Sequence, residues 1–272
     1  MAESTVLQRC ISEAYNQANQ KLRLANITRW CAFAATIVAL CFTPPSWFPL
    51  LVFLFCVPTE FLLLRNETLK HRAEQLKSTH EIADGLGIVP CKIDLANAAA
   101  EFLKAPVASE DLLKGLVFAS SVPPSPQRVL ENLRESAWWS HQGAKIAAQR
   151  TFIQILLLVG IAALIPLGLP HFVGTIKSAI TGTLFSSSII LAIFSLGVGK
   201  RAWGLYQFSV AASRTATQAQ ELLRGTDAPH ERDATFLLHR YQLDRVSSPS
   251  IPSSIWSKNR EHLNTLYKDQ FN

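Results

Sequence analysis

The sequence lacks the residue patterns on which most metal sites, disulfide frameworks and catalytic centres depend. Its five cysteines form no CxxC pair and have no histidine partner at metal-binding spacing, so we expect neither a zinc site nor a disulfide framework. HEIAD (80–84) lacks the second histidine of a zinc protease, GLG (85–87) lacks the lysine of a phosphate-binding loop, and HRYQLD (239–244) matches a kinase catalytic loop in only two letters. We therefore expect no enzyme, no catalytic residue, no metal and no cofactor.

Long apolar stretches are confined to two blocks, residues 30–64 and 152–198, each interrupted by a turn-forming segment. Crossing a bilayer takes about 20 mostly apolar residues, and the second block supplies two such stretches. Pro49, Pro58 and Glu60 interrupt the first block, so its two segments either span the bilayer or form a re-entrant hairpin. We predict an all-α membrane protein whose four transmembrane helices form two hairpins and continue into a mainly helical cytoplasmic domain.

Positive charge sets the predicted orientation, because Lys and Arg are held on the cytoplasmic side of a membrane. The net charge is +6, and every Lys and Arg except Lys177 lies outside the two hairpins, which places both termini in the cytoplasm. The first apolar segment starts too far into the chain to be a removable signal peptide. The predicted parts are a cytoplasmic N-terminal amphipathic helix (1–29), transmembrane hairpin 1 (30–64), a cytoplasmic sensor segment (65–150), transmembrane hairpin 2 (151–199) and cytoplasmic C-terminal helices (200–272).

Small apolar residues, many of them alanine, recur at helical spacing on the cytoplasmic side of each predicted span. This pattern predicts four amphipathic helices that pack closely into a cytoplasmic bundle continuous with the membrane helices. The stripes comprise Leu7, Ile11, Tyr15, Ala18, Leu22 and Ala25; Leu69, Ala73, Leu76 and Ala83; Leu130, Leu133, Ala137, Ala144 and Ala148; and Leu205, Phe208, Ala212, Ala216, Ala219 and Leu223.

Two segments combine tryptophan with positive charge. In SAWWSHQGAKIAAQR (136–150), Trp139 precedes Arg150 by 11 residues, about 16 Å along a helix and too far from the predicted membrane boundary for an interfacial anchor. Tryptophan flanked by cations and amides suits a nucleobase stacked on the ring with its phosphates paired to Arg or Lys. The candidate ligand-binding residues are Arg134, Trp138, Trp139, Gln142, Lys145, Trp256 and Arg260.

Ordinary packing is the alternative interpretation of both tryptophan segments. Trp138 then lies beneath the central insert, and the C-terminal helix docks on the bundle through the apolar residues around Trp256. His141 falls within an alanine stripe, where a hydrogen-bonded core histidine is expected in preference to a pH switch.

The second hairpin contains small and hydroxyl-bearing residues at regular spacing. Ser178, Gly182 and Ser186 form a ridge that permits close helix contact, and Thr181, Ser188 and Ser195 follow one another at seven-residue intervals. The hydroxyl groups either line a water-filled path in an oligomer or bond back to their own helix. Glu60 is a further candidate for the membrane region, with pairing to Arg29 or Arg65 as its simpler role.

The chain resembles the SMODS-associating four-transmembrane effectors of bacterial CBASS-type antiphage systems. The resemblance rests on the two hairpins, on Gln8, Tyr15 and Ala18 in the first helix, and on the late Ile-Pro-x-x-Ile-Trp…Arg segment (251–260). It implies an inner-membrane effector that binds a cyclic di- or trinucleotide, assembles with further copies of itself in the lipid bilayer, and causes abortive infection by opening a pore or disrupting the membrane. It implies no polymeric nucleic acid as partner.

Two other functions remain compatible with the sequence. A constitutive small channel or transporter would move its substrate without an activating nucleotide. A non-catalytic membrane scaffold that recruits a cytoplasmic partner would change no permeability at all.

Overall fold

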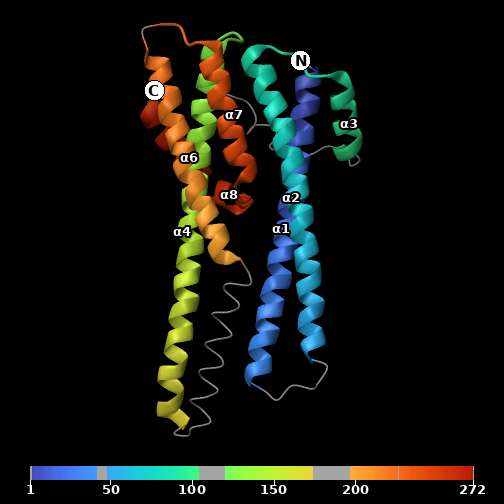
Figure 1. Ribbon diagram of the computed structural model, residues 1–272, viewed down its shortest axis with the longest axis vertical. Coiled ribbons are helices and arrows are strands. Elements are labelled where there is room, and N and C mark those ends of the chain that lie inside the picture. Colours follow the sequence, from blue (N-terminus) through green and yellow to red (C-terminus); the bar gives the residue numbers. More distant parts are fainter. Residues whose placement is uncertain (1, 42–47, 104–119, 174–196, 226, 272) are drawn as a thin grey trace. The chain divides into compact units, whose positions relative to one another are not determined.

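The computed structural model describes residues 2–41, 48–103, 120–173, 197–225 and 227–271, and over these ranges the chain is helical without a strand. The described ranges contain seven helices (Figure 1): α1 (Ala2–Cys41), α2 (Phe48–Leu86), α3 (Lys92–Phe102), α4 (Pro126–Val173), α6 (Val198–Arg224), α7 (Glu231–Ser247) and α8 (Ser253–Phe271). The expected helical secondary structure is therefore found in this part of the chain.

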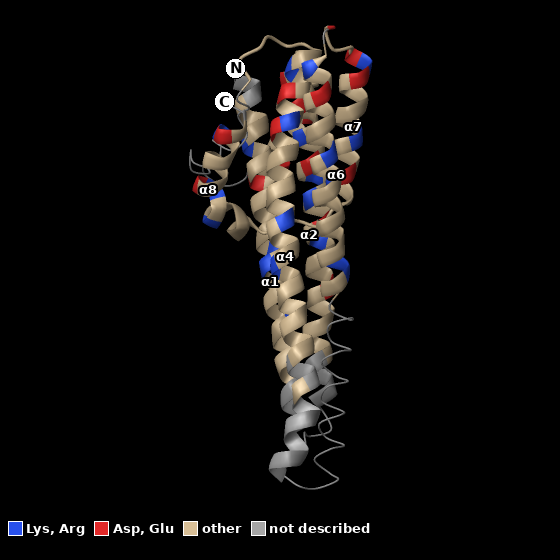
Figure 2. Ribbon diagram, turned by 90° about the vertical axis from the view of Figure 1, so that its left-hand side faces the viewer, with Lys and Arg blue, Asp and Glu red and all other residues tan. Residues whose placement is uncertain are grey.

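The contacts divide the chain into two compact units, each built from separate segments. Unit 1 contains residues 1–19, 66–145 and 205–272, and unit 2 contains residues 20–65 and 146–204. Figure 2 shows that Lys, Arg, Asp and Glu are concentrated on the helices of unit 1. The long helices α1, α2 and α4 contribute to both units, so unit 1 collects parts of the predicted N-terminal helix, sensor segment and C-terminal helices.

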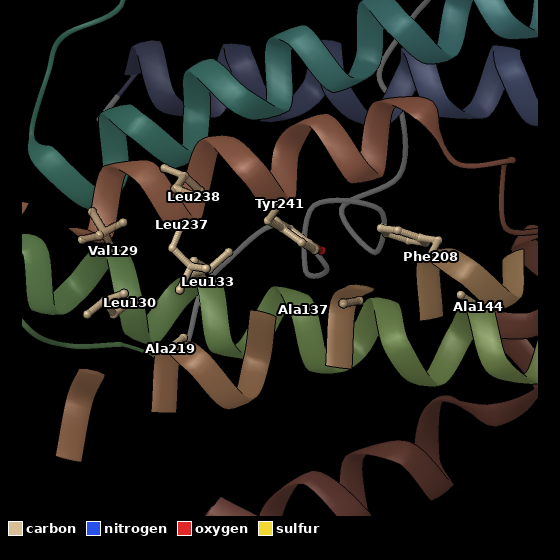
Figure 3. Close-up of a cluster of buried hydrophobic side chains, with 12 residues drawn as sticks. Val129, Leu130, Leu133, Ala137, Ala144, Phe208, Ala219, Leu237, Leu238 and Tyr241 are labelled. Atoms are coloured by element: carbon tan, nitrogen blue, oxygen red, sulfur yellow. The ribbon is translucent and has the colours of Figure 1, made fainter. Parts of the chain in front are cut away.

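The larger core of unit 1 joins α4, α6 and α7 (Figure 3). Alanines at helical spacing on α4 and α6 are fully buried, so these helices approach closely, as the alanine stripes of the sequence predict. The Tyr241 ring stacks on Phe208 at 6.4 Å, and its hydroxyl lies 2.7 Å from Ser140 Oγ and donates to the Ser136 carbonyl at 3.0 Å. The polar end of this buried ring is thus satisfied by α4.

A second core of unit 1 joins α3 to the N-terminal part of α1 and to α2. Ala98 and Phe102 of α3 pack against Cys10, Ala14 and Ala73, and Figure 1 shows α3 beside α1. Leu95 adds a third α3 contact by packing against Leu7 and Ile11, both buried on α1. This amphipathic helix therefore covers one side of the α1–α2 pair.

Unit 2 presents many large apolar side chains at its surface. The Thr28 and Thr59 hydroxyls meet at 2.6 Å between α1 and α2, and Ala25 and Ala32 are buried. Its exposed apolar residues include Phe53, Leu54, Val57, Phe61 and Leu64 on α2 and Phe152, Ile153, Leu156 and Leu157 on α4. Unit 2 differs in this respect from unit 1, whose helices bury most of their apolar faces.

The prediction of four transmembrane helices is wrong for the part of the chain that the structure describes. No helix there has a stretch that is both long and apolar enough to cross a membrane. The apolar end of α1 runs only from Trp30 to Cys41, and α2 carries Pro58 and Glu60 within its apolar part. The same finding contradicts the expectations of a multi-pass inner-membrane protein and of a pore-forming effector.

The second predicted hairpin lies largely beyond the described part of the chain. Residues 174–196 and the side chains of 165–173 are outside it. Among the predicted packing and pore residues, this applies to Ser178, Thr181, Gly182, Ser186, Ser188 and Ser195.

Candidate ligand-binding site

Unit 1 contains a cavity of about 520 Å³, a volume within the range of sites that hold small organic ligands. Its walls come from α1, α2, α4, α6, α7 and α8 and from the segment between α7 and α8. Aromatic rings and charged groups share these walls: the lining includes Tyr15, Trp139, Phe208 and Trp256, together with Lys70, Glu74, Lys77, His80, Glu135, Arg245 and Arg260. The cavity therefore offers stacking surfaces and ionic groups to one ligand.

An aromatic cluster between α4 and α8 forms one wall of the cavity. The Trp139 ring lies 6.1 Å from Tyr267 in a stacked arrangement and 6.5 Å from Trp256 in a tilted one. Trp138 meets Tyr267 edge to face at 5.1 Å, and its Nε1 donates to Gln270 Oε1 at 2.9 Å. Trp138 is buried behind the wall, whereas Trp139 and Trp256 line the cavity.

Gly143 allows α8 to approach α4 at this wall. A Cβ placed on Gly143 would lie 2.3 Å from Cη2 and 2.6 Å from Cζ2 of Trp256, distances that real side chains do not tolerate. The indole of Trp256 therefore occupies the space that any other residue at 143 would fill.

A second part of the lining belongs to a buried ion cluster built around Arg245 of α7. Its Nε donates to Glu74 Oε2 at 2.5 Å, and its Nη1 and Nη2 donate to the two oxygens of Glu81 at 2.6 and 3.0 Å. Gln242 Nε2 also donates to Glu81 at 3.1 Å, and the guanidinium lies 5.1 Å from the Tyr241 ring centre. Both carboxylates come from α2, so the cluster ties α7 to α2 through a bidentate pair.

The electrostatics of the cluster follow from its burial. Burial alone would raise the pKa of Glu81, but Arg245 and then Lys77 lower it below the usual value. Burial and the Glu74 charge raise the pKa of Tyr15 well above its usual range, so its hydroxyl stays protonated and donates to Glu74. Glu81 therefore stays ionised, and both Glu74 and Glu81 accept hydrogen bonds from Arg245.

Lys70 and Lys77 line the same wall but have different environments. Lys70 Nζ donates to the carbonyls of Arg245 and Val246 at 3.0 and 3.1 Å and to that of Ser248, so it caps the end of α7. Lys77 Nζ lies 4.0 Å from Glu81, beyond hydrogen-bond distance. Burial, and next the charge of Arg245, lower the pKa of Lys77. An anion in the cavity would favour the charged form of Lys77 and so oppose this lowering of its pKa.

The structure brings together three of the seven predicted ligand-binding residues, because Trp139, Trp256 and Arg260 all line the cavity. The other four do not line it. Trp138 is buried, Arg134 Nη1 donates to Gln220 at 2.7 Å, Gln142 is half-buried, and Lys145 is exposed.

Two further residues singled out in the sequence lie elsewhere. His141 Nδ1 lies 2.8 Å from the Ser209 carbonyl oxygen and 3.0 Å from its hydroxyl, the arrangement expected of a hydrogen-bonded core histidine. Glu60 is exposed on α2, and its charge acts on Arg29.

Sequence analysis missed the charged wall of the cavity. Lys70, Glu74, Lys77 and Glu81 follow one another at spacings of four, three and four residues, which places them on one face of α2. A charged stripe of this kind is typical of a solvated helix face. Its members directly follow the core-facing residues Leu69, Ala73 and Leu76, however, and this position indicates that the charged groups lie at the edge of the core. Within the described ranges, no group of three His, Cys, Asp or Glu side chains is placed to hold a metal ion.

Comparisons of the chain with protein-family models, with curated proteins and with solved structures give no match. The proposed function therefore rests on the cavity and its residues.

Proposed function

We propose that unit 1 is a receptor for a nucleotide second messenger, a cyclic di- or trinucleotide, and binds it in the cavity without converting it. The observation that carries this proposal is the convergence of Trp139, Trp256 and Arg260 on one cavity of about 520 Å³. The sequence pattern predicts stacking on the two tryptophans and phosphate pairing to Arg260. Their meeting at one site supports a common ligand.

The chemistry of the walls fits the two parts of a nucleotide. A base has a π face that stacks on Trp139 or Trp256, and each such contact contributes about 1–3 kcal/mol. A phosphate diester pairs with Arg260, which follows Trp256 by one turn of α8, and with Lys77 on α2. The stacking surfaces thereby come from α4 and α8, and the cations come from α8 and α2.

Calorimetric titration of the full-length protein with a panel of cyclic dinucleotides and trinucleotides tests the proposal. At least one should bind, and Trp139→Ala should weaken its binding roughly 5- to 150-fold, the equivalent of one lost stack. Trp203→Ala is the matched control, because Trp203 is an exposed tryptophan of unit 2. Chromatography of the probe after incubation should recover it unchanged.

A second pair of variants tests the phosphate contact. Arg260→Ala should weaken binding and flatten its dependence on salt, because one charge contact is lost. Lys258→Ala removes a charge from an exposed neighbour on α8 that does not line the cavity, and should leave binding unchanged. If no member of the panel binds, or if Trp139→Ala and Arg260→Ala bind like the wild type, the proposal is wrong.

The antiphage role implied by the family resemblance stays a proposal supported by that resemblance alone. A nucleotidyltransferase encoded beside this chain would support it.

A further inference from the structure

We propose that one face of α2 in unit 2 is a self-association surface, which pairs in parallel with the same face of a second copy of the chain. This surface, the α2 seam, consists of Leu54, Val57, Phe61 and Leu64, whose residues are between 51 and 63 % exposed. Large apolar side chains gathered on an exposed face are typical of a contact surface for a partner. The pairing is independent of nucleotide binding in unit 1.

The spacing of the α2 seam fits a helical partner. Its four residues follow one another at intervals of three, four and three, the alternation of the two apolar positions a and d in a coiled-coil heptad. On a helix of 3.6 residues per turn they lie within about 80° of the circumference. The fold already orders this part of α2 as a helix, so the pairing does not have to order it, and a short seam suffices.

Charged side chains border the α2 seam on its two sides and specify what pairs with it. Glu60 occupies the heptad position g on one side, Arg65 occupies position e on the other, and both residues are exposed. In a parallel pair of helices, position g of one helix faces the position e that lies five residues later on its partner. Glu60 of each copy therefore faces Arg65 of the other, and the twofold symmetry of the pair makes this contact twice.

The same relation gives Pro58 a place in the contact. Phe53 and Pro58 also stand five residues apart at positions g and e, so Phe53 of each copy faces Pro58 of the other in an apolar contact. Pro58 and Glu60 thus border the α2 seam and interrupt none of its apolar positions.

The charges also set the direction of the pairing. In an antiparallel pair, position g faces position g and position e faces position e. Glu60 would then meet the acidic side of the other copy, and Arg65 would meet its basic side. Opposite charges face each other only in the parallel arrangement.

Arg65 is held at the edge of the α2 seam by the seam itself. Its guanidinium carbon lies 5.5 Å from the centre of the Phe61 ring, the geometry of a cation–π contact. The cation is thereby placed beside the apolar face before any partner arrives. The charge of Glu60 also acts on Arg29 of the same chain, and a carboxylate with two acceptor oxygens can serve a second cation.

The exposed apolar face of α4 lacks this complementarity. It includes Ile153, Leu156 and Leu157, but residues 151–173 contain no Lys, Arg, Asp or Glu. No charge there distinguishes one apolar partner from another. The α2 seam is therefore the surface whose own charges identify a second copy as its partner.

Sedimentation of the full-length protein over roughly 1–100 μM, a range that detects weak association, tests the pairing. The wild type should change from monomer to dimer as its concentration rises. Glu60→Arg and Arg65→Glu should each raise the dimer Kd at least about tenfold, because like charges then meet at both contacts. Glu101→Arg, which reverses the charge of an exposed glutamate on α3, is the matched control and should leave the Kd unchanged.

Mixing the two charge variants separates specific pairing from general apolar attraction. A Glu60→Arg chain and an Arg65→Glu chain restore both opposite-charge contacts in a heterodimer, so an equal mixture should dimerise again. The double variant with both changes should dimerise with itself for the same reason. Circular dichroism and the melting temperature verify that each variant is folded.

Disulfide formation tests the parallel register without relying on charge. In a chain freed of its native cysteines, Val57→Cys should cross-link to its own copy on oxidation, because a parallel pair places identical d positions opposite each other within disulfide reach. Leu156→Cys on α4 should stay monomeric.

Several results would overturn the pairing: a wild type that stays monomeric, charge variants that dimerise like the wild type, or a mixture that does not restore the dimer. A monomer whose α2 seam binds a different protein or phosphatidylcholine vesicles would assign the seam to that partner and equally refute self-association. Trp139→Ala should leave the dimer Kd unchanged, so failure of the nucleotide proposal and failure of the pairing are distinguishable.

Discussion

Replacing Gly143 with alanine tests the contact that seats α8 on α4. The added Cβ would lie 2.3, 2.6 and 3.0 Å from three atoms of the Trp256 ring, whereas ordinary contact begins at 3.4 Å. The rigid indole must therefore retreat by about 1.1 Å at its closest atom, the difference between 2.3 and 3.4 Å. Overpacking of this kind costs about 1–3 kcal/mol.

The alanine also has a favourable effect that must be subtracted. Gly to Ala within a helix stabilises by about 0.5–1 kcal/mol. We therefore expect Gly143→Ala to lower the free energy of unfolding by up to about 2.5 kcal/mol, centred near 1 kcal/mol, and the melting temperature by about 2–4 °C per kcal/mol for a chain of this size. Thermal and denaturant unfolding followed by circular dichroism measure both quantities.

Two further variants isolate the cause. Gly160→Ala lies on the same helix with nothing within 4 Å of the new Cβ, so it should be neutral or stabilising. Trp256→Leu lacks the three ring atoms in question, so Gly143→Ala should be harmless in that background, and the two changes should show a coupling energy. A Gly143→Ala protein as stable as the wild type, or equally destabilised with and without Trp256→Leu, would refute the seating of Trp256 on Gly143.

Three other perturbations follow from the buried contacts, each measured by equilibrium unfolding. Arg245→Leu removes the cation that pairs with two buried carboxylates and should destabilise the protein by about 3–5 kcal/mol; a loss below 1 kcal/mol would mean that the cluster is hydrated. Because the pKa of Glu81 is lower in the folded chain than its usual 4.5, its stabilising contribution is present above that pH. It should disappear as the pH falls through the folded pKa, and Glu81→Gln should make the acid side of the stability profile shallower. Trp138→Phe removes the hydrogen bond to Gln270 and should cost about 0.5–1.5 kcal/mol without changing the affinity for the nucleotide probes; a weakened affinity would place Trp138 in the site.

The fold was predictable where local periodicity decides it. The stripes containing Ala137, Ala144, Ala212 and Ala219 gave the close packing of α4 with α6, because alanine at helical spacing permits close approach. The membrane spans are contradicted within the described ranges, where the first hairpin depended on joining short apolar stretches to polar and proline-containing ones. Pro58 and Glu60 were visible in the sequence and argue against such joining in α2.

The candidate site was predictable only in part. Tryptophan occurs only six times in the chain, and Arg260 follows Trp256 by four residues, so local sequence context singles out Trp139, Trp256 and Arg260. Glu74 and Arg245 pair across 171 residues of sequence, and no local pattern shows which acid meets which base. Trp138 and Trp139 are neighbours in the sequence, but they lie on different sides of α4. Only the packing of α8 shows that Trp139 lines the cavity and that Trp138 is buried.

The cavity of unit 1 also has a consequence for synthesis of the protein. Its walls include Tyr15 and Lys70 from the first two helices and Trp256 and Arg260 from α8, so they remain incomplete until the ribosome has made the last described helix. At about 5–20 residues per second, the interval between Lys70 and Trp256 lasts on the order of 10–40 s. Until residue 245 is made, Glu74, Glu81 and Lys77 have no Arg245 to meet, and the nascent α2 carries its charged stripe in water. The cavity is therefore completed in one late step, and a chain interrupted before α8 carries most of the core residues of unit 1 but only part of the cavity wall.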